Sequence, residues 1–435
     1  MPKLRFNACN LNFGVLKIAR LKSWLSKTVL LLSIVSLLND VAGELLYPVL
    51  PLYMASIGYG AIWIGVLEGF AEAIAGLTKG WFGEWSDKRG MRLPFVRLGY
   101  LLSALSKPLL ATFASAPWAL FMRSSDRLGK GIRTGARDAL LAEEAGAHKG
   151  KVFGFHRSLD TLGAVIGPVL ALTWLAFHKG ENYKSLFYFA LIPGLLCVLL
   201  LFLIKEKKVA KTSFTLPRSP FSSFSYWKRS TPEYRSLTGA ILAFTLFNSS
   251  DMFLLLMVKN IFKSGITIDF NGPAKINSDM LVVGFYIFYN IIYAVASYPA
   301  GVLADKFGPK RMLLIGFICF ALAYGGIGFA ALGGASDIAF VLACFLIYGF
   351  YAACTDGVSK AWVSVLCRKE DKGLALGLFS GLQSFATLAA SVTAGLVWTF
   401  IHPATVFFSA AVMSGVIIFY ITFAVKSPAK PIHIN

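Results

Sequence analysis

Charged residues are scarce in this 435-residue chain, of which they make up 15%, whereas a soluble domain carries about 25%. Apolar residues make up 56%, and apolar runs of about 20 residues recur, which is the length that crosses a hydrocarbon core of ~30 Å. Too few polar groups remain to cover a soluble surface. The composition therefore excludes a soluble enzyme, a disordered chain and a small disulfide-stabilised domain.

Cysteine is also sparse, and its spacing carries no pattern. The six cysteines include no C-x-x-C pair and lie mostly inside apolar runs, so we expect small packing residues rather than disulfides or metal ligands. The sequence has no phosphate-binding P-loop, no H-E-x-x-H and no G-x-S-x-G. It therefore predicts no enzyme activity, no cofactor and no bound metal.

Acidic residues are outnumbered 22 to 42 by Lys and Arg, which gives a net charge of +20. In a soluble protein this excess would suggest a nucleic-acid partner. In a membrane protein it marks the cytoplasmic loops. With both termini on one side of the membrane, most basic residues outside the spans fall on that side. The opposite loops hold only Lys179, Lys184, Lys263 and Lys275. We therefore expect cytoplasmic termini and no nucleic acid.

Twelve apolar segments are predicted to cross a lipid bilayer as helices, at about 28–56, 60–82, 94–115, 117–143, 152–177, 186–204, 237–262, 280–303, 312–333, 338–365, 374–400 and 404–425. A polar, proline-containing stretch separates the sixth from the seventh. The predicted fold class is an all-α membrane protein with twelve transmembrane helices in two pseudo-symmetric six-helix bundles, acting as a monomer. The predicted parts are a basic N-terminal segment (1–27), a first bundle (28–204), a linker (205–236), a second bundle (237–425) and a tail (426–435).

Three correspondences relate the two halves to each other. The pattern G-x-x-x-D-K-x-G occurs at residues 83–90, after the second span, and at 301–308, after the eighth. Residues 126–130 align with 356–360, because each segment begins with Asp and ends with Lys. Lys149, Gly150 and Gly154 align with Lys372, Gly373 and Gly377. Parallel repeats around a site in the middle of the membrane are an architecture of secondary transporters.

The two repeated loops resemble the signature loop of the major facilitator superfamily, and the resemblance extends over about residues 28 to 425. Residues 127–131 are similar to its fourth-span pattern R-x-x-Q-G, with Lys130 in place of Gln. Residues 163–168, Gly-Ala-Val-Ile-Gly-Pro, resemble the fifth-span signature of its drug/proton antiporter branch. The resemblance implies two six-helix bundles and transport by alternating access. It also implies that the loop aspartates pair with neighbouring helix ends and gate the path. Their implied basic partners are Lys88 and Arg92 for Asp87, and Lys310 and Arg311 for Asp305; Lys306 is a further gating candidate in the second loop.

The fourth span carries five cations on one helical face, at spacings of 4, 3, 3 and 4 residues. A charge at the bilayer centre costs at least ~2.5 kcal/mol, so these cations should face the bundle interior and have partners. One partner would be an anionic substrate, since Arg matches carboxylate and phosphate groups; the other would be acids on neighbouring helices. We expect Arg123, Arg127 and Lys130 to line the cavity. Arg133 and Arg137 are expected to be gate residues close to the Asp87 loop.

Acids in the first two spans form two pairs with four-residue spacing, which places each pair on one helix face. Two close carboxylates in a low dielectric cannot both stay ionised, so one of them is a candidate for carrying a coupling proton. The same acids could instead form static ion pairs with the fourth-span cations. The candidates for proton coupling are Asp40 and Glu44, Glu68 and Glu72, and Asp126 and Asp160.

The second half has fewer charges in its spans. Asp356 and Lys360 are four residues apart and are expected to neutralise each other. Polar and aromatic residues share one face of the eighth span, and with amides from two other spans they could form a milder wall of the same cavity. These residues are Tyr286, Tyr289, Asn290 and Tyr293, with Asn248 and Gln383.

The predicted function is secondary active transport of a small organic solute. We expect an anion, either a carboxylate or a phosphorylated compound, moved by alternating access with H⁺ coupling across a bacterial inner membrane. A multidrug/H⁺ antiporter is an alternative that the fifth-span motif favours. A divalent metal exporter that uses Asp40, Glu44 and Asn248 is a weaker alternative. A receptor or enzyme built on the same helices would need a sensory domain or catalytic group that the sequence does not offer.

Overall fold

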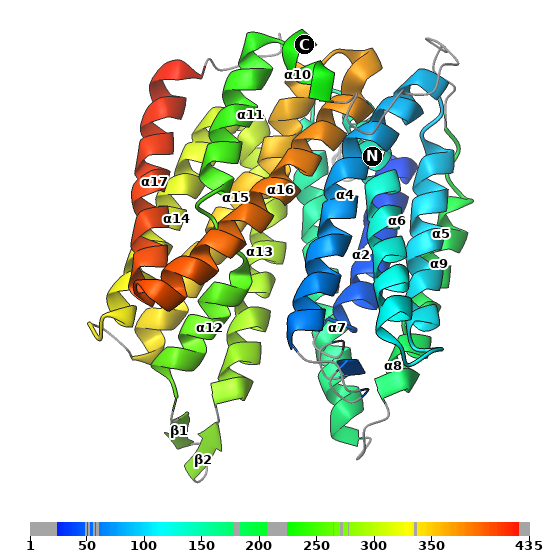
Figure 1. Cartoon of the computed structure of the whole chain (residues 1–435). Coiled ribbons are helices and arrows are strands. Elements are labelled where there is room, and N and C mark those ends of the chain that lie inside the picture. The colour runs from blue at the N-terminus through cyan, green and yellow to red at the C-terminus, as the bar shows by residue number, and fades with distance from the viewer. Residues whose placement is uncertain are drawn as a thin grey trace, which may run out of the picture.

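The computed structural model describes residues 24–47, 50, 53–54, 57, 61–177, 183–206, 224–263, 265–269, 273–276, 278–334 and 337–425. Nearly all of these residues lie in helices that run alongside one another in two bundles (Figure 1). The first helix begins and the last helix ends at the same end of the molecule, which we call the terminal end. Most of the predicted N-terminal segment, the middle of the predicted linker and the predicted tail lie outside the described residues.

The first bundle accounts for the six spans predicted before the linker. The sixth of them is interrupted at Ala190 instead of being continuous. Pro193 explains the interruption, because its nitrogen cannot donate the helical hydrogen bond to Phe189. The helices are α2 (Lys27–Glu44), α4 (Ala61–Arg89), α5 (Leu93–Leu110), α6 (Ala116–Glu144), α7 (Lys149–Phe177), α8 (Tyr183–Phe189) and α9 (Leu191–Leu201).

The second bundle follows the short helix α10 (Ser225–Arg229) and contains the other six spans. If α8–α9 and α11–α12 each count as one interrupted span, the described helices make twelve passes, which confirms the predicted fold class. The helices are α11 (Pro232–Thr245), α12 (Asp251–Ile261), α13 (Ser278–Phe307), α14 (Pro309–Ala331), α15 (Ile338–Leu366), the 3₁₀ helix η2 (Lys369–Asp371), α16 (Lys372–Phe400) and α17 (Pro403–Ala424).

The seventh span breaks in its middle, where the sequence predicted one helix over 237–262. Residues 246–250 separate α11 from α12, and Ser250 caps α12 by accepting a hydrogen bond from the Met252 nitrogen at 3.4 Å. Asn and Ser side chains compete with helical hydrogen bonds, and three of them stand in a row at 248–250. The break places polar groups and a helix N-terminus inside the second bundle.

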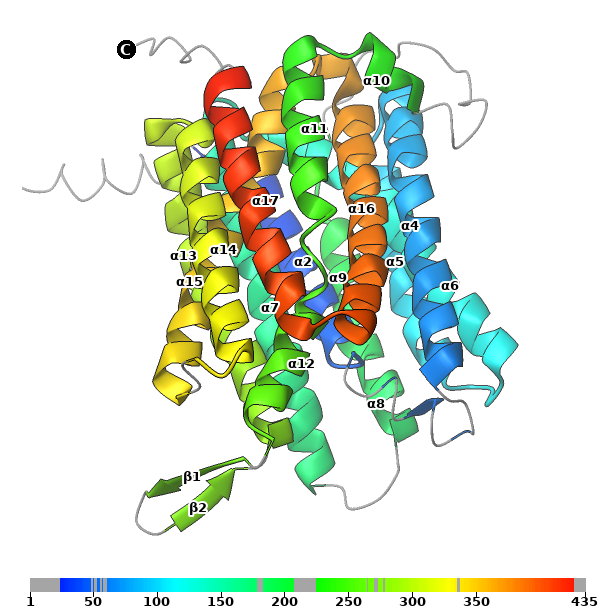
Figure 2. The same ribbon diagram turned by 60° about the vertical axis from the view of Figure 1, so that its left-hand side comes forward.

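The connection between α12 and α13 contains a small antiparallel hairpin that the sequence did not predict. Strand β1 (Ile266–Asp269) pairs with β2 (Pro273–Ile276), with Ile266 opposite Ile276. The hairpin lies at the end of the molecule opposite the terminal end (Figure 2). It changes neither the two-bundle arrangement nor the number of passes.

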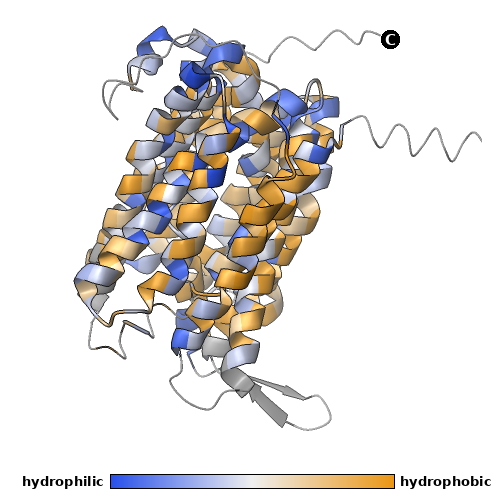
Figure 3. Cartoon of the chain, turned by 90° about the vertical axis from the view of Figure 1, so that its right-hand side faces the viewer, coloured by the Kyte–Doolittle hydropathy of each residue, from blue (hydrophilic) through white to orange (hydrophobic). Residues whose placement is uncertain are grey.

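Among the described residues, six helical segments are long and apolar enough to span a membrane by composition alone, and five of them belong to the second bundle. In the first bundle only Tyr183–Leu201 meets the criterion among the described residues, because the other helices carry more charge, most of all α6. Figure 3 shows apolar residues along the length of the helices and hydrophilic residues concentrated at the terminal end. The charges that lie between the ends of the helices therefore need to face inward.

Close contacts between glycines join the two bundles at the terminal end. Helix α4 packs on α16, and α7 packs on α13. A Cβ atom placed on Gly83 would lie 2.2 Å from the Gly373 carbonyl oxygen, and one placed on Gly301 would lie 2.1 Å from the Gly150 carbonyl oxygen. Only glycine permits this approach, so the bundles are closed against each other on both sides of the terminal end.

Candidate functional site: a charged cavity between the bundles

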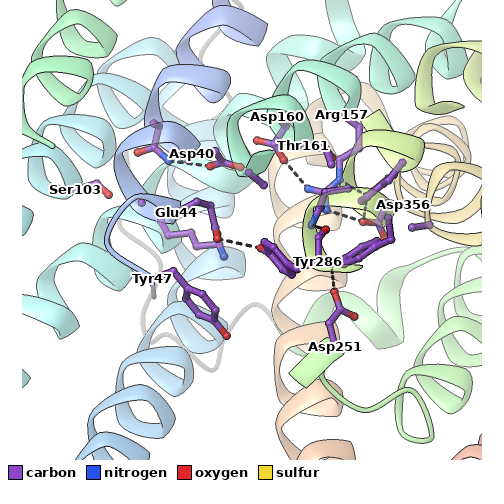
Figure 4. A pocket seen from close by; sticks show the side chains of 18 of the residues that line it. Asp40, Glu44, Tyr47, Ser103, Arg157, Asp160, Thr161, Asp251, Tyr286 and Asp356 are labelled. Atoms are coloured by element: carbon purple, nitrogen blue, oxygen red, sulfur yellow. Dashed lines mark hydrogen bonds and ion pairs between the residues drawn. The ribbon is translucent and has the colours of Figure 1, made fainter. Parts of the chain in front are cut away.

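Two adjoining cavities lie between the bundles. The smaller cavity has a volume of about 390 Å³ and the larger about 760 Å³, within the range of small-molecule sites. Figure 4 shows the smaller cavity. The charged residues that line both cavities are Asp40, Arg127, Lys130, Arg133, Arg157, Asp160 and Asp356.

Three of the predicted cavity and coupling residues on the fourth span form an ion-pair cluster. The Arg123 guanidinium lies 3.3 Å from the Asp126 carboxylate, which also accepts from Lys107 at 3.2 Å. Arg127 Nε lies 3.9 Å from the Glu72 carboxylate. Arg123, Asp126, Arg127 and Glu72 therefore balance charge inside the first bundle, as the static alternative predicted.

The five cations on one face of the fourth span form what we call the stripe, and Lys130 and Arg133 differ from its other three members. Among the described residues, the Lys130 ammonium has neither a hydrogen bond nor an ion pair within 4.0 Å. The Arg133 guanidinium lies over the Tyr100 ring, 4.3 Å from its centroid, and its buried Nε and Nη1 have no hydrogen-bond partner. The sequence placed Arg133 beside the Asp87 loop, but the structure places it in the walls of both cavities.

Arg137, the second predicted gate residue, reaches the other bundle through one acid. Its guanidinium pairs with Asp138 at 2.9 Å and donates to Ser36 at 3.3 Å. The Asp138 carboxylate is fully buried, and it also accepts a hydrogen bond of 2.7 Å from Lys360 of α15. One buried carboxylate thus holds a cation from each bundle.

The predicted mutual neutralisation of Asp356 and Lys360 is wrong. Asp356 instead pairs with Arg157 of α7 at 2.8 Å, while Lys360 pairs with Asp138. The four-residue spacing does place both on one face of α15, but that face meets the first bundle, where each finds an opposite charge. Arg157 also pairs with Asp160 at 2.6 Å, and it donates to Tyr293, whose hydroxyl donates to Asp356.

Two of the predicted coupling acids lack a basic partner. Among the described residues, neither Asp40 nor Glu44 has a cation within 4.0 Å. Asp40 accepts from the Asn39 amide at 3.2 Å and faces the Asp160 carboxyl across the contact of α2 with α7. Glu44 accepts from the Tyr286 hydroxyl of the second bundle at 3.2 Å (Figure 4). The Glu68 side chain lies outside the described residues.

Asp251 is a cavity acid that the sequence analysis did not select as a site residue. It begins α12 at the break in the seventh span, and its carboxylate accepts from the Tyr289 and Tyr348 hydroxyls at 2.5 and 2.6 Å. It has no cation within 4.0 Å among the described residues. The polar run at 248–251 inside an apolar segment was the available signal.

The predicted aromatic wall does line the cavities. The eighth-span residues line the smaller cavity, and Gln383 lines the larger one. Asn248 bonds to the Tyr351 hydroxyl at 2.9 Å, and Tyr348 and Tyr351 of α15 extend the wall beyond the predicted set. The predicted members at the smaller cavity are Asn248, Tyr286, Tyr289, Asn290 and Tyr293.

The fifth-span motif packs helices together instead of lining either cavity with its glycines. A Cβ on Gly163 would lie 2.5 Å from the Leu37 carbonyl oxygen, and one on Gly167 would lie 2.7 Å from the Leu45 nitrogen. The two glycines therefore let α7 approach α2 closely. This approach brings Asp160 up to Asp40.

The two loop aspartates cap helices of the opposite bundle. Asp87 accepts from the Leu374 nitrogen at the start of α16, at 2.9 Å. Asp305 accepts from the Gly150 and Lys151 nitrogens at the start of α7, both at 2.8 Å. A carboxylate at a helix N-terminus is stabilising by roughly 0.3–1 kcal/mol when exposed and more when buried. These hydrogen bonds hold the two bundles together at the terminal end, and we call the contacts of Asp87 and Asp305 the two latches.

The basic partners that the resemblance implied differ between the two latches. Arg92 does pair with Asp87, at 2.9 Å, and it also pairs with Glu143. Lys88 pairs with Glu84 instead, at 2.9 Å. No described basic side chain forms an ion pair with Asp305: Lys310 bonds to two carbonyls at the end of α17, and Lys306 lies over the Phe307 ring. The implied pairing of Asp305 with Lys310 and Arg311 is therefore wrong, since backbone amides occupy its carboxylate.

Comparisons with known proteins agree with this arrangement. The family model described as Major Facilitator Superfamily matches residues 32–272 and 261–434. MJ1317, an MFS-type transporter of Methanocaldococcus jannaschii, is 33% identical over 400 residues, which cover 91% of this chain and 95% of that protein. The multidrug resistance protein MdtG of Klebsiella pneumoniae is 25% identical over 296 residues, 66% of this chain and 67% of that protein. The crystal structure of the human organic anion transporter MFSD10 superposes with a TM-score of 0.76 at 16% identity, over 91% of this chain and 98% of that chain.

Proposed function

Because this chain belongs to the Major Facilitator Superfamily and is a multi-pass membrane transporter, we propose that it carries a small organic anion, a carboxylate or a phosphorylated compound, by alternating access with proton coupling. The substrate would occupy the two cavities between the bundles. The latches at Asp87 and Asp305 would hold the terminal end closed in this state and release when that end opens.

The uncommitted cations Lys130 and Arg133 carry this proposal. The other three cations of the stripe, Arg123, Arg127 and Arg137, also line a cavity but contact acids of their own bundle, whereas Lys130 and Arg133 face the cavities without a hydrogen-bond partner. A buried cation is stable only with a partner, and a carboxylate or phosphate would supply both opposite charge and acceptors. The organic anions named for MFSD10, a protein of similar fold, fit this chemistry.

Proton coupling is supported by the acids that lack a cation. Asp40 is buried and faces Asp160, whose charge is paired with Arg157, so Asp40 would hold the proton of this pair of carboxyls. Glu44 hydrogen-bonds to Tyr286 across the bundle interface. A change in the protonation of Asp40 or Glu44 would therefore alter contacts near the interface between the bundles. Contacts at this interface must break when the bundles move.

Multidrug efflux with H⁺ antiport is the second candidate, favoured by the distant likeness to MdtG and by the fifth-span motif. Lys130 and Arg133 favour a polar anion over a lipophilic cation when the cavity acids without a basic partner, Asp40, Glu44 and Asp251, are protonated. The metal exporter has less support. The described residues bring together no group of three or more His, Cys, Asp and Glu side chains that could hold a metal ion.

The proposed location is a bacterial inner membrane with the terminal end in the cytoplasm. Hydrophilic residues gather at that end (Figure 3), and the basic loops of the sequence fall there. This orientation would make the structure closed toward the cytoplasm.

Substituting Lys130 by Gln is expected to weaken binding of the transported anion by roughly ten- to a hundredfold, because a hydrogen bond to a charged group contributes about 1.5–3 kcal/mol. The measurement is a thermal-shift titration of the purified chain against panels of anions, lipophilic cations and divalent metals. Arg229→Gln, which removes an exposed charge of α10, is the matched control and should bind as wild type does. Equal binding by wild type and the Lys130 variant would contradict the proposal.

A further inference from the structure

The larger cavity has two chemically different walls. Helices α2, α4, α6 and α7 contribute charged side chains of both signs and one histidine, His156; Lys130 and Arg133 are among the cations. Helix α16 faces them with a row of neutral polar side chains at spacings of 3, 1, 3 and 4 residues, which lies on one helical stripe about 16 Å long. The members of this hydroxyl–amide row are Ser380, Gln383, Ser384, Thr387 and Ser391.

Several polar groups of this cavity have no partner within the described residues. Ser380 and His156 are 6% and 5% exposed, and neither the serine Oγ nor either ring nitrogen of the histidine has a hydrogen-bond partner. Gln383, which is half-buried, and Thr387, which is exposed to the cavity, make no side-chain hydrogen bond to any described residue. Burying the polar groups of Ser380 and His156 without partners costs stability, and Gln383 and Thr387 offer free donors and acceptors at the same cavity, so together they point to a ligand that satisfies them.

The other two members of the row, Ser384 and Ser391, already accept hydrogen bonds through their hydroxyls. Ser384 accepts a hydrogen bond of 2.5 Å from the Lys79 ammonium of the first bundle. Ser391 accepts one of 3.2 Å from the Ser250 nitrogen, at the break in the seventh span. The side chains of the row that are free to bond a ligand are therefore those of Ser380, Gln383 and Thr387, which line the same cavity as Lys130 and Arg133.

We infer that the transported anion is polyhydroxylated, so that its carboxylate or phosphate sits on Lys130 and Arg133 while its hydroxyls bond to Ser380, Gln383 and Thr387. This inference rests on the proposed function and names its substrate class. Serine and threonine hydroxyls and the glutamine amide both donate and accept, as the hydroxyls of a polyol do. An aliphatic or aromatic body would leave the row unpaired, and α16 offers no charge in this row for a second anionic group.

Matched ligand pairs test the inference on the purified full-length chain. Gluconate and hexanoate share a six-carbon carboxylate and differ in their hydroxyls; sorbitol 6-phosphate and hexyl phosphate form the corresponding phosphorylated pair. Calorimetric titration should give a dissociation constant at least about tenfold lower for the hydroxylated member of at least one pair, since a site built to hydrogen-bond a hydroxyl rejects the analogue that lacks it. Neutral sorbitol should bind more weakly than either hydroxylated anion.

The outcomes separate the two proposals. If hexanoate and hexyl phosphate bind as tightly as their hydroxylated counterparts, the hydroxyl subsite is wrong and the anion proposal stands. If none of the four anions binds while a lipophilic cation does, both proposals fail together.

Substitution of the row gives the independent check. Gln383→Leu and Thr387→Val should reduce the preference for the hydroxylated anion at least about threefold each and leave the affinity for the unsubstituted anion unchanged. Thr393→Val makes the same change on the same helix at an exposed position outside both cavities, and it should keep the full preference. Retention of that preference in the Gln383 and Thr387 variants would overturn the inference.

Discussion

Replacing Gly301 with leucine is expected to slow transport by about ten- to a hundredfold. A Cβ at this position would lie 2.1 Å from the Gly150 carbonyl oxygen and 3.1 Å from the Gly154 Cα, so the larger side chain would force α13 away from α7. Overpacking a tight contact costs about 1–3 kcal/mol, and here the cost falls on the state closed at the terminal end. Alternating access requires that state, so its loss slows every cycle.

Initial rates of substrate uptake in proteoliposomes measure this effect, and a distance measurement identifies its cause. Spin labels at Glu144 and Glu370, exposed on opposite bundles at the terminal end, should move apart in the Gly301→Leu variant. Gly415→Leu is the matched control, because no atom lies within 4 Å of the Cβ position there. Normal transport together with an unchanged distance in Gly301→Leu would show that the glycine contact is not needed for closure.

Substituting Asp138 by Asn is expected to destabilise the folded protein by roughly 3–5 kcal/mol, the cost of removing one partner from a buried ion pair. The Asp138 carboxylate is fully buried and holds both Arg137 and Lys360. Without its charge, two cations remain near each other with no acid between them. The apparent melting temperature in detergent should therefore fall strongly.

A second substitution shows whether Asp138→Asn destabilises the protein by unbalancing the charges of Asp138, Arg137 and Lys360 or by changing the packing of the side chain. Lys360→Met in the Asp138→Asn background removes one of the two stranded cations and should recover part of the lost thermal stability. Lys360→Met alone should cost less than Asp138→Asn, since Asp138 keeps Arg137. If the double variant is no more stable than Asp138→Asn, the triad does not act as a charge-balanced unit.

Much of the architecture was predictable because it follows from patterns among residues that are close together in the sequence. Long apolar runs mark the spans, and the repeated loop with Asp87 and Asp305 marks the ends where the bundles meet. The five-cation stripe also follows from helical periodicity alone. Each of these features depends on residues that are close in sequence, so no knowledge of how the helices pack was needed.

The choice of partners depended on packing and could not be predicted. Asp356 and Lys360 satisfy the spacing rule for a helical ion pair, yet each finds a better placed charge on the opposite bundle. Arg133 was assigned to the gate because it was expected near the Asp87 loop, but its guanidinium stacks on the Tyr100 ring at the cavity. Asp251 lies at a helix break, and its partners are tyrosines of two other helices, which are far from it in the sequence. The partner of each of these side chains is determined by tertiary contacts between segments that are far apart in the sequence.

The central claim is that this protein couples the movement of an anion to that of protons through the cavity between its bundles. The most direct test measures uptake of an anion that the protein binds into proteoliposomes, with and without a pH gradient, for wild type and for Asp40→Asn. The asparagine side chain cannot ionise, so position 40 can no longer take up or release a proton. We predict that the gradient changes the wild-type rate several-fold and leaves the rate of the Asp40→Asn protein unchanged. A wild-type rate that is the same with and without the gradient would contradict the claim.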